Sequence, residues 1–228
     1  MKIFLDSASL DEIRIWAERG LVDGVTTNPA LLAREGADPL VQIKKIASIV
    51  SGPVSVQVTR SAVGEMVQQG SRLAAIGKNI VVKLPASIAG LDAAIRLHGL
   101  GIRINITLGF DAAQIVPFAR VPVDFFSLIV GRVEDFGSNS SKQIAEARAL
   151  LDQTGSVTEL LVASIRNPTH LRAAIIGGAD AVTVPPAAWT SIFSHPNTLQ
   201  GIADFSVAWE TLAQTLRTGY DSLSTEVD

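Results

Sequence analysis

Eight short apolar segments alternate with stretches that carry helix signals, and this alternation limits the possible folds more than any other feature of the chain. The segments recur roughly every 20–35 residues, which is the spacing of repeated β-strand–α-helix units. Eight such units in one chain of 228 residues favour a closed parallel barrel over an open sheet. The expected strands cover residues 2–6, 24–26, 54–57, 80–83, 104–107, 125–130, 159–163 and 181–184.

Several of the intervening stretches begin with recognisable helix starts. Ser9 followed by Glu12 is a capping-box pattern, and Pro39 after Asp38 is a first-turn proline. Further helices are expected over residues 62–76, 90–98, 111–118, 141–151 and 168–176, after Pro185-Pro186, and over 202–216. We therefore predict an α/β fold in one domain, residues 1–228: a single (β/α)8 (TIM) barrel with an extra C-terminal helix. That helix, about 202–216, has more apolar residues than one barrel edge needs, which suggests contact with a neighbouring subunit.

The composition supports a folded chain and removes several classes of function. Hydrophobic residues make up 47% of the chain and charged residues 18%, so a large core can form. A net charge of −3 and a pI near 5.6 give no sign of a nucleic-acid partner. The chain has no cysteine, which excludes disulfides and thiolate chemistry and suits a reducing compartment. No apolar run approaches ~18 residues, so we expect a cytoplasmic protein with no membrane partner.

The fourth expected strand ends in Lys83 and is stopped by Pro85. Three β-branched residues precede the lysine, which is typical of a strand buried on both faces of a parallel sheet. At such a strand end, desolvation disfavours the charged ammonium, and a neutral amine is a nucleophile. The segment is also compatible with a lysine that extends to solvent, and the residues themselves leave both interpretations open.

In a barrel of this type, catalytic side chains lie at the carboxyl ends of the strands. Lys83 and Asp6 occupy two such ends, and an amine facing a carboxylate is what Schiff-base carbonyl chemistry requires. Arg132 and Arg166, with Ser164, are suited to bind a dianion such as phosphate. The other polar strand ends are Thr26, Asn28, Gln57, Thr59, Asn105, Thr107, Ser127 and Thr183.

Each of these residues also has a purely structural explanation. Asp6 can cap a helix, the arginines can form ordinary salt bridges, and the asparagine, threonine and serine side chains can satisfy loop backbone. His98, His170 and His195 lack metal-ligand spacing, so we predict that they lie on helix surfaces or ends and bind no metal. Glu134-Asp135 is interpreted as a solvated loop pair.

Two segments resemble a known family. Residues 23–32 resemble the first signature of transaldolases, and residues 80–85 resemble their Schiff-base lysine segment. The similarity extends over essentially the whole chain, and the length is closest to the small transaldolase and fructose-6-phosphate aldolase subgroup. The resemblance implies a (β/α)8 barrel, no metal or organic cofactor, sugar-phosphate substrates, and a place in carbohydrate metabolism such as the pentose phosphate pathway. It also implies a homo-oligomer, a pentamer or decamer, in which the C-terminal helix reaches a neighbour.

The same resemblance assigns roles to individual residues. Lys83 would form the imine with the donor ketose, and Asp6 would be the acid/base that deprotonates its C4 hydroxyl. Gln57 and Thr107 would hold a catalytic water. The implied substrate-binding residues are Thr26, Asn28, Asn105 and Ser127 for the donor, and Arg132, Ser164 and Arg166 for its phosphate.

The chain departs from the family pattern at two positions. Gln57 stands where transaldolases usually carry glutamate and the aldolase subgroup carries glutamine, and an amide cannot exchange a proton as a carboxylate does. Ile129 stands where transaldolases have phenylalanine and the aldolases have tyrosine. We expect a transaldolase that transfers a dihydroxyacetone unit from a ketose phosphate to an aldose phosphate. The alternatives are an aldolase that releases free dihydroxyacetone and a sugar-phosphate-binding barrel without turnover.

Overall fold

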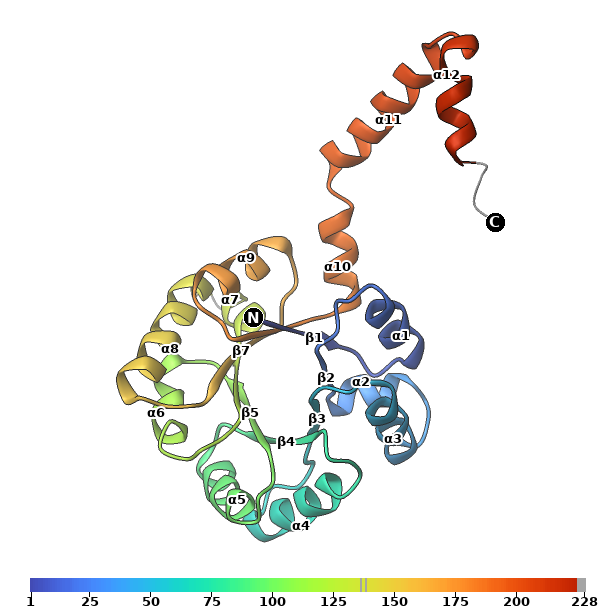
Figure 1. Cartoon of the computed structure of the whole chain (residues 1–228). Coiled ribbons are helices and arrows are strands. Elements are labelled where there is room, and N and C mark those ends of the chain that lie inside the picture. The colour runs from blue at the N-terminus through green and yellow to red at the C-terminus, as the bar shows by residue number, and fades with distance from the viewer. Residues whose placement is uncertain (136, 138, 225–228) are drawn as a thin grey trace. The chain divides into compact units, whose positions relative to one another are not determined.

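The strands form a closed parallel barrel, as the sequence predicts. The computed structural model describes residues 1–135, 137 and 139–224. Among these residues, eight strands pair each with the next one in the sequence, and the last pairs with the first (Figure 1). They are β1 (Lys2–Asp6), β2 (Gly24–Thr26), β3 (Val54–Gln57), β4 (Ile80–Pro85), β5 (Ile104–Gly109), β6 (Phe125–Ile129), β7 (Glu159–Ala163) and β8 (Ala181–Val184).

Helices connect consecutive strands around the barrel, and one more helix follows β8 (Figure 1). They are α1 (Leu10–Glu18), α2 (Pro29–Arg34), α3 (Pro39–Ile49), α4 (Val63–Ala74), α5 (Ile88–Gly99), η1 (Ala112–Gln114), α6 (Ile115–Phe118), α7 (Val130–Glu134), α8 (Ser140–Thr154), α9 (Pro168–Ile176) and α10 (Pro186–Phe193). The sequence did not indicate the short helices α2 and α7. Val130 was expected to end a strand, but it is the first residue of α7, so Arg132 lies on a helix that follows β6 directly.

The start of α1 is linked to the end of β1. Ser9 accepts the backbone N–H of Glu12, as the capping-box pattern predicts. The Glu12 carboxylate, however, accepts from Ser7 Oγ at 2.6 Å, and the Ser9 N–H donates to the same hydroxyl at 3.1 Å. Only half of the predicted box therefore forms, because Ser7 competes for the glutamate. The hydrogen bonds of the Ser7 hydroxyl hold the chain immediately after Asp6.

Side chains from alternate strand positions fill the barrel interior. Phe4 and Phe125 meet there edge to face, with ring centroids 5.4 Å apart, inside a buried cluster that includes Val81, Leu161 and Ala181. Gly24 leaves space for the Phe4 ring, since a Cβ on this glycine would lie 2.8 Å from that ring. Side chains along a strand alternate between two faces, so the residues two positions later also face inward. These are Asp6, Lys83, Ser127, Ala163 and Thr183.

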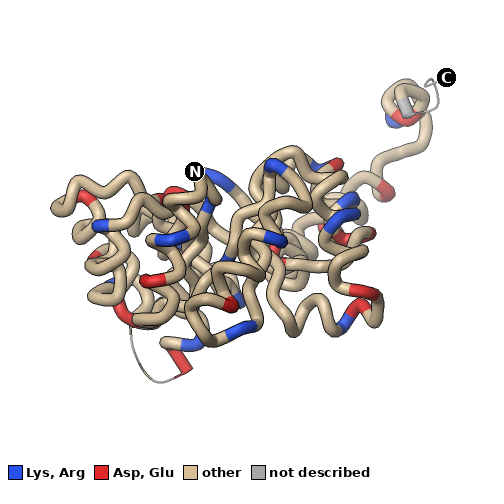
Figure 2. Tube along the Cα trace, turned by 90° about the horizontal axis from the view of Figure 1, so that it is seen from below, with Lys and Arg blue, Asp and Glu red and all other residues tan. Residues whose placement is uncertain are grey.

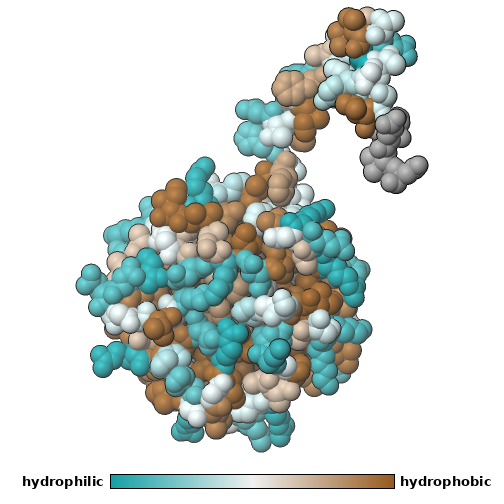
Figure 3. Space-filling model, in the orientation of Figure 1, coloured by the Kyte–Doolittle hydropathy of each residue, from teal (hydrophilic) through white to brown (hydrophobic). Residues whose placement is uncertain are grey.

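The chain divides into two compact units, Met1–Trp189 with the barrel and a second unit from Thr190 onward. The second unit contains α11 (Pro196–Thr211), α12 (Gln214–Asp221) and the short η2 (Ser222–Ser224). The prediction of one helix over 202–216 is wrong, because Leu212 and Ala213 adopt extended backbone with ψ of 134° at both residues. Within this unit the Trp209 and Tyr220 rings lie 5.0 Å apart. Phe205, Leu216 and Tyr220 are exposed, and Figure 3 shows hydrophobic residues on its surface.

Charged residues of both signs are distributed along the barrel unit without separation into patches, as Figure 2 shows. This distribution agrees with the small net charge of −3. No helix within residues 1–135, 137 and 139–224 combines the length and the apolar character that crossing a membrane demands.

Candidate active site

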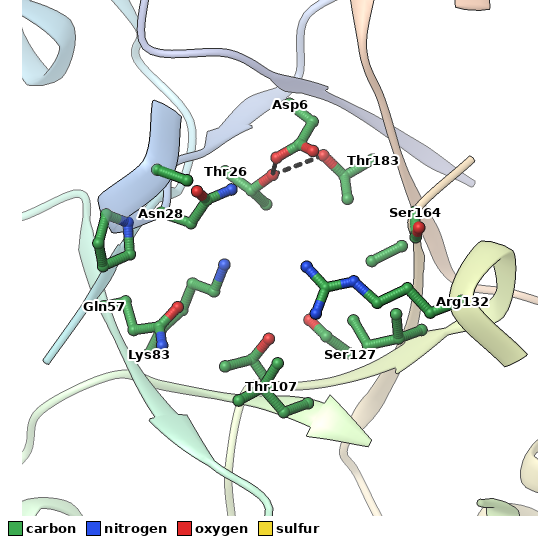
Figure 4. A pocket seen from close by; sticks show the side chains of 15 residues that line it. Asp6, Thr26, Asn28, Gln57, Lys83, Thr107, Ser127, Arg132, Ser164 and Thr183 are labelled. Carbon is green, nitrogen blue, oxygen red and sulfur yellow. Dashed lines mark hydrogen bonds between the residues drawn. The ribbon is translucent and has the colours of Figure 1, made fainter. Parts of the chain in front are cut away.

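A cavity of about 350 Å³ opens at the carboxyl ends of the barrel strands (Figure 4). This is the position at which the sequence predicts the functional residues. Nine of the eleven predicted residues line it: Asp6, Thr26, Asn28, Gln57, Lys83, Thr107, Ser127, Arg132 and Ser164. The remaining lining residues are Pro29, Ala30, Leu108, Ile129, Ala163 and Thr183.

Lys83 enters the cavity from β4 and does not extend to bulk solvent. Its side chain is buried, and its Nζ donates to the Thr27 carbonyl oxygen at 3.0 Å. Burial lowers the pKa of the Lys83 amine below the usual lysine range, and the negative charge of Asp6 opposes this shift in part. A lowered pKa leaves a larger fraction of the amine uncharged near neutral pH, and only the uncharged form can add to a carbonyl.

Asp6 enters the same cavity from β1, as Figure 4 shows. Burial raises the pKa of this carboxyl above the usual aspartate range, against the opposing effects of the Lys83 charge, the Thr26 hydrogen bond and the Arg132 charge. A raised pKa brings the carboxyl closer to the pH at which it can both accept and return a proton. The structure thus brings together a buried amine and a partly buried acid, and desolvation shifts the pKa of each toward its neutral form.

Two threonine hydroxyls support Asp6 in series. Thr26 Oγ1 lies 2.7 Å from Asp6 Oδ1 and 2.7 Å from Thr183 Oγ1. The single hydroxyl proton of Thr26 goes to the carboxylate, so Thr183 donates to Thr26. Thr183 was identified from sequence only as a polar strand end, without a role. Strand alternation from Ala181 was the signal that placed it in the barrel mouth.

Arg132 and Ser164 lie together on one side of the cavity. Figure 4 shows the Arg132 guanidinium pointing toward the cavity centre, near Ser127. Ser164 adopts a φ of 63°, which is unusual for a residue with a side chain and costs on the order of 1 kcal/mol. Strain of this kind persists only where surrounding contacts hold it. A guanidinium and a hydroxyl at one end of a cavity are suited to bind an anionic group.

Arg166, the second predicted arginine, does not line the cavity. Its Nη1 donates to both carboxylate oxygens of Asp135, at 2.7 and 2.9 Å, and its side chain is 46% exposed. The structure therefore places one guanidinium in the cavity where the sequence analysis placed two. Glu134 and Asp135 are both exposed, as expected of a solvated pair, but Glu134 lies in α7 and both residues have partners, His170 for Glu134 and Arg166 for Asp135.

Asn105 also lies outside the cavity lining. It is fully buried, accepts from Ser127 Oγ at 2.7 Å and donates to Ser55 Oγ at 3.0 Å. Asn105 therefore fixes the Ser127 hydroxyl, which does line the cavity. Asn28 has two roles. It lines the cavity, and its Oδ1 caps α2 by accepting from the Leu31 N–H.

The lining residues contain a single carboxyl group, that of Asp6. Within the described residues, no group of three or more histidine, aspartate or glutamate side chains is arranged to hold a metal ion.

Comparisons with known proteins place the chain in a family. Residues 3–224 match the family described as Transaldolase/Fructose-6-phosphate aldolase. A probable transaldolase of Lactiplantibacillus plantarum is 42% identical over 215 residues, which cover 94% of this chain and 99% of the relative. A probable transaldolase of Caulobacter sp. is 42% identical over 216 residues, 95% of this chain and 100% of the relative. The chain belongs to the transaldolase/fructose-6-phosphate aldolase family.

The two positions at which the sequence was expected to depart from the transaldolase pattern both face the cavity. Gln57 contributes an amide at the end of β3, and Ile129 contributes an aliphatic side chain at the end of β6. Among the described lining residues, Asp6 alone carries a carboxyl that can move a proton, and none has an aromatic ring. Both features bear on the substrate, because they alter proton transfer and available space.

Proposed function

We propose that this enzyme is a transaldolase that moves a dihydroxyacetone unit from a ketose phosphate to an aldose phosphate through an imine on Lys83. The observation that carries this proposal is the buried Lys83 amine and the partly buried Asp6 carboxyl facing one cavity. A protein that only binds sugar phosphates does not need a desolvated amine, so the pair argues against a barrel without turnover.

The first half of the reaction would break a carbon–carbon bond. The Lys83 amine adds to the C2 carbonyl of the ketose, and loss of water gives an iminium ion. Asp6 accepts the proton of the C4 hydroxyl, the C3–C4 bond breaks, and its electron pair moves to the iminium nitrogen. An aldose phosphate leaves, and a dihydroxyacetone enamine stays bound to Lys83.

The second half would run in the reverse direction on a new aldehyde. The enamine carbon attacks the acceptor carbonyl, and the new alkoxide takes the proton from Asp6. Water then hydrolyses the iminium and restores the free amine. In this scheme Gln57 and Thr107 hold the water, Thr26 and Asn28 contact the donor, and Ser127 contacts the dihydroxyacetone unit with Asn105 behind it.

We assign donor phosphate binding to Arg132 and Ser164, because they supply a charged donor and a hydroxyl at one side of the cavity. Arg166 would contribute only if its guanidinium left Asp135. The cytoplasm is the proposed location, since a chain without cysteine suits a reducing compartment.

The alternative activity is an aldolase that releases free dihydroxyacetone, and the amide of Gln57 at the cavity favours it. The two activities differ in their need for an acceptor. Given a ketose phosphate donor and a panel of aldose acceptors, we expect product formation to be at least about tenfold faster with an acceptor than without one. Products are identified by mass. Dihydroxyacetone released equally fast without any acceptor would show that the enzyme is an aldolase.

We also propose that the chain assembles into a homo-oligomer, a pentamer or decamer. The helices α11 and α12 support this, because none of their residues is buried. Even large apolar side chains are exposed, Phe205 to 78% and Leu216 to 72%, and a neighbouring subunit could cover them. Size-exclusion chromatography with light scattering is expected to give five or ten times the subunit mass of 24.1 kDa. A particle of one subunit mass would contradict this proposal.

A further inference from the structure

The helix that carries Arg132 packs closely against the loop that carries Ser164. Gly131 is the contact point, since a Cβ at this residue would lie 2.3 Å from the Ser164 carbonyl oxygen and 2.8 Å from Arg166 Nε. Only a residue without a side chain allows this approach. The two segments follow neighbouring strands, β6 and β7, so their separation at this point sets the distance between Arg132 and Ser164 on that side of the cavity (Figure 4).

Beyond Gly131, the same helix is joined to α9 through Glu134 and His170. His170 lies in the first turn of α9, at a helix end as predicted, but it is not on the surface, since it is 3% exposed. Its Nδ1 accepts the backbone N–H of Arg166 at 3.3 Å, so this nitrogen carries no proton. Nε2 is therefore the protonated nitrogen, and it donates to Glu134 Oε2 at 2.5 Å. One histidine thus connects the Ser164 loop, α9 and α7.

Two further contacts fix this arrangement. Ser140, the first residue of α8, donates to the other carboxylate oxygen of Glu134. The hydrogen bond from Ser140, more than those from His170 and the nearby charges, lowers the pKa of Glu134 despite the opposing effect of burial, so this residue remains a carboxylate. Next to it, Asp135 binds the guanidinium of Arg166 through both oxygens. Three contacts therefore join the two segments: Gly131 with Ser164, Glu134 with His170, and Asp135 with Arg166.

We propose that Glu134 and His170 are positioning residues that hold Arg132 against Ser164 and so set the affinity for the phosphate of the donor. Neither side chain lines the cavity, and each acts through the segment that it anchors. The inference rests on the proposed function in one respect, that the Arg132 end of the cavity receives the phosphate. Ser164 makes the arrangement sensitive, because its strained backbone relaxes when the surrounding contacts are lost.

The experiment compares a phosphorylated and a non-phosphorylated ketose donor in the full-length enzyme. For Glu134→Ala and His170→Asn we expect KM for the ketose phosphate to rise about tenfold, with kcat changed by less than about threefold. His170→Asn keeps an acceptor for the Arg166 N–H, but its shorter side chain does not bring an N–H to the position of Nε2 beside Glu134. His170→Gln places an amide donor near Glu134, and its KM is expected to lie closer to that of the wild type. KM for the non-phosphorylated ketose is expected to stay unchanged in all three variants.

The matched control is Glu146→Ala on α8, a glutamate whose exposed ion pair with Lys142 includes no residue of either segment. Equal changes in KM for both donors, together with a lower Tm, would show a merely structural role and overturn the proposal. Stabilisation by inorganic phosphate, read as a shift in Tm, gives a second measurement that needs no turnover. We expect a smaller shift in Glu134→Ala than in the wild type and in Glu146→Ala, and equal shifts would overturn the proposal. If the wild type responds to phosphate but converts no ketose phosphate, the proposed function fails while the positioning role stands.

Discussion

Replacing Lys83 by methionine is expected to abolish turnover and to prevent any covalent attachment of the substrate. Loss of a general acid or base costs about 10²–10⁴-fold, and loss of the imine-forming amine should cost more, because no later step has a covalent intermediate to act on. The measurement is borohydride reduction in the presence of a ketose phosphate, followed by peptide mass analysis. The wild type should gain the mass of the reduced donor on the peptide that contains Lys83, and the variant should gain none.

The variant is expected to fold, which makes the loss of activity interpretable. Methionine matches the length of the lysine stem, and it removes a buried amine whose desolvation is unfavourable. The Thr27 carbonyl loses its donor at a cost of about 1–3 kcal/mol, so the net change in Tm should be small. Lys142→Met is the control, because this lysine is exposed and pairs only with Glu146 among the described residues. Label on another lysine, or turnover by Lys83→Met, would refute the proposed mechanism.

The position of this amine shows how much local sequence pattern can predict. Strand alternation from Val81 to Lys83 and from Phe4 to Asp6 places both groups inside the barrel once the eight-fold repeat is recognised. The bounds of β1, β2, β3, β7 and β8 agree with the sequence prediction. These features depend on apolar runs and strand period, which a sequence displays directly.

The features that the sequence did not predict depend on contacts between distant residues. Glu134 meets His170 thirty-six positions later in the sequence, and nothing near either residue marks the other as its partner. Arg166 follows a strand end as Arg132 does, but Asp135 binds its guanidinium outside the cavity. Asn105 has the polarity of a substrate contact, yet Ser55 and Ser127 satisfy its amide inside the barrel. Strand-end position therefore predicts which residues approach the mouth, and tertiary partners decide which of them face it.

Replacing Asp6 by asparagine is expected to lower turnover by about 10²–10⁴-fold while leaving imine formation intact. Asparagine keeps the shape of the side chain, and its carbonyl oxygen can still accept from Thr26, whose hydroxyl lies 2.7 Å from Asp6 Oδ1. It cannot accept the C4 hydroxyl proton, so carbon–carbon cleavage loses its base. Single-turnover cleavage of a ketose phosphate measures the affected step.

The same substitution separates imine formation by Lys83 from proton transfer by Asp6. The charge of Asp6 raises the pKa of Lys83, so removing that charge lowers the lysine pKa further below its usual range. The uncharged amine is then at least as abundant at a given pH, and borohydride should trap the intact ketose phosphate on Lys83 in Asp6→Asn at least as readily as it traps the donor in the wild type. Asp11→Asn serves as control, because this aspartate on α1 has an 88% exposed side chain. Cleavage within about tenfold of the wild type in Asp6→Asn would remove Asp6 as the base. Loss of trapping would instead mean that Asp6 acts earlier, when the amine adds to the ketone.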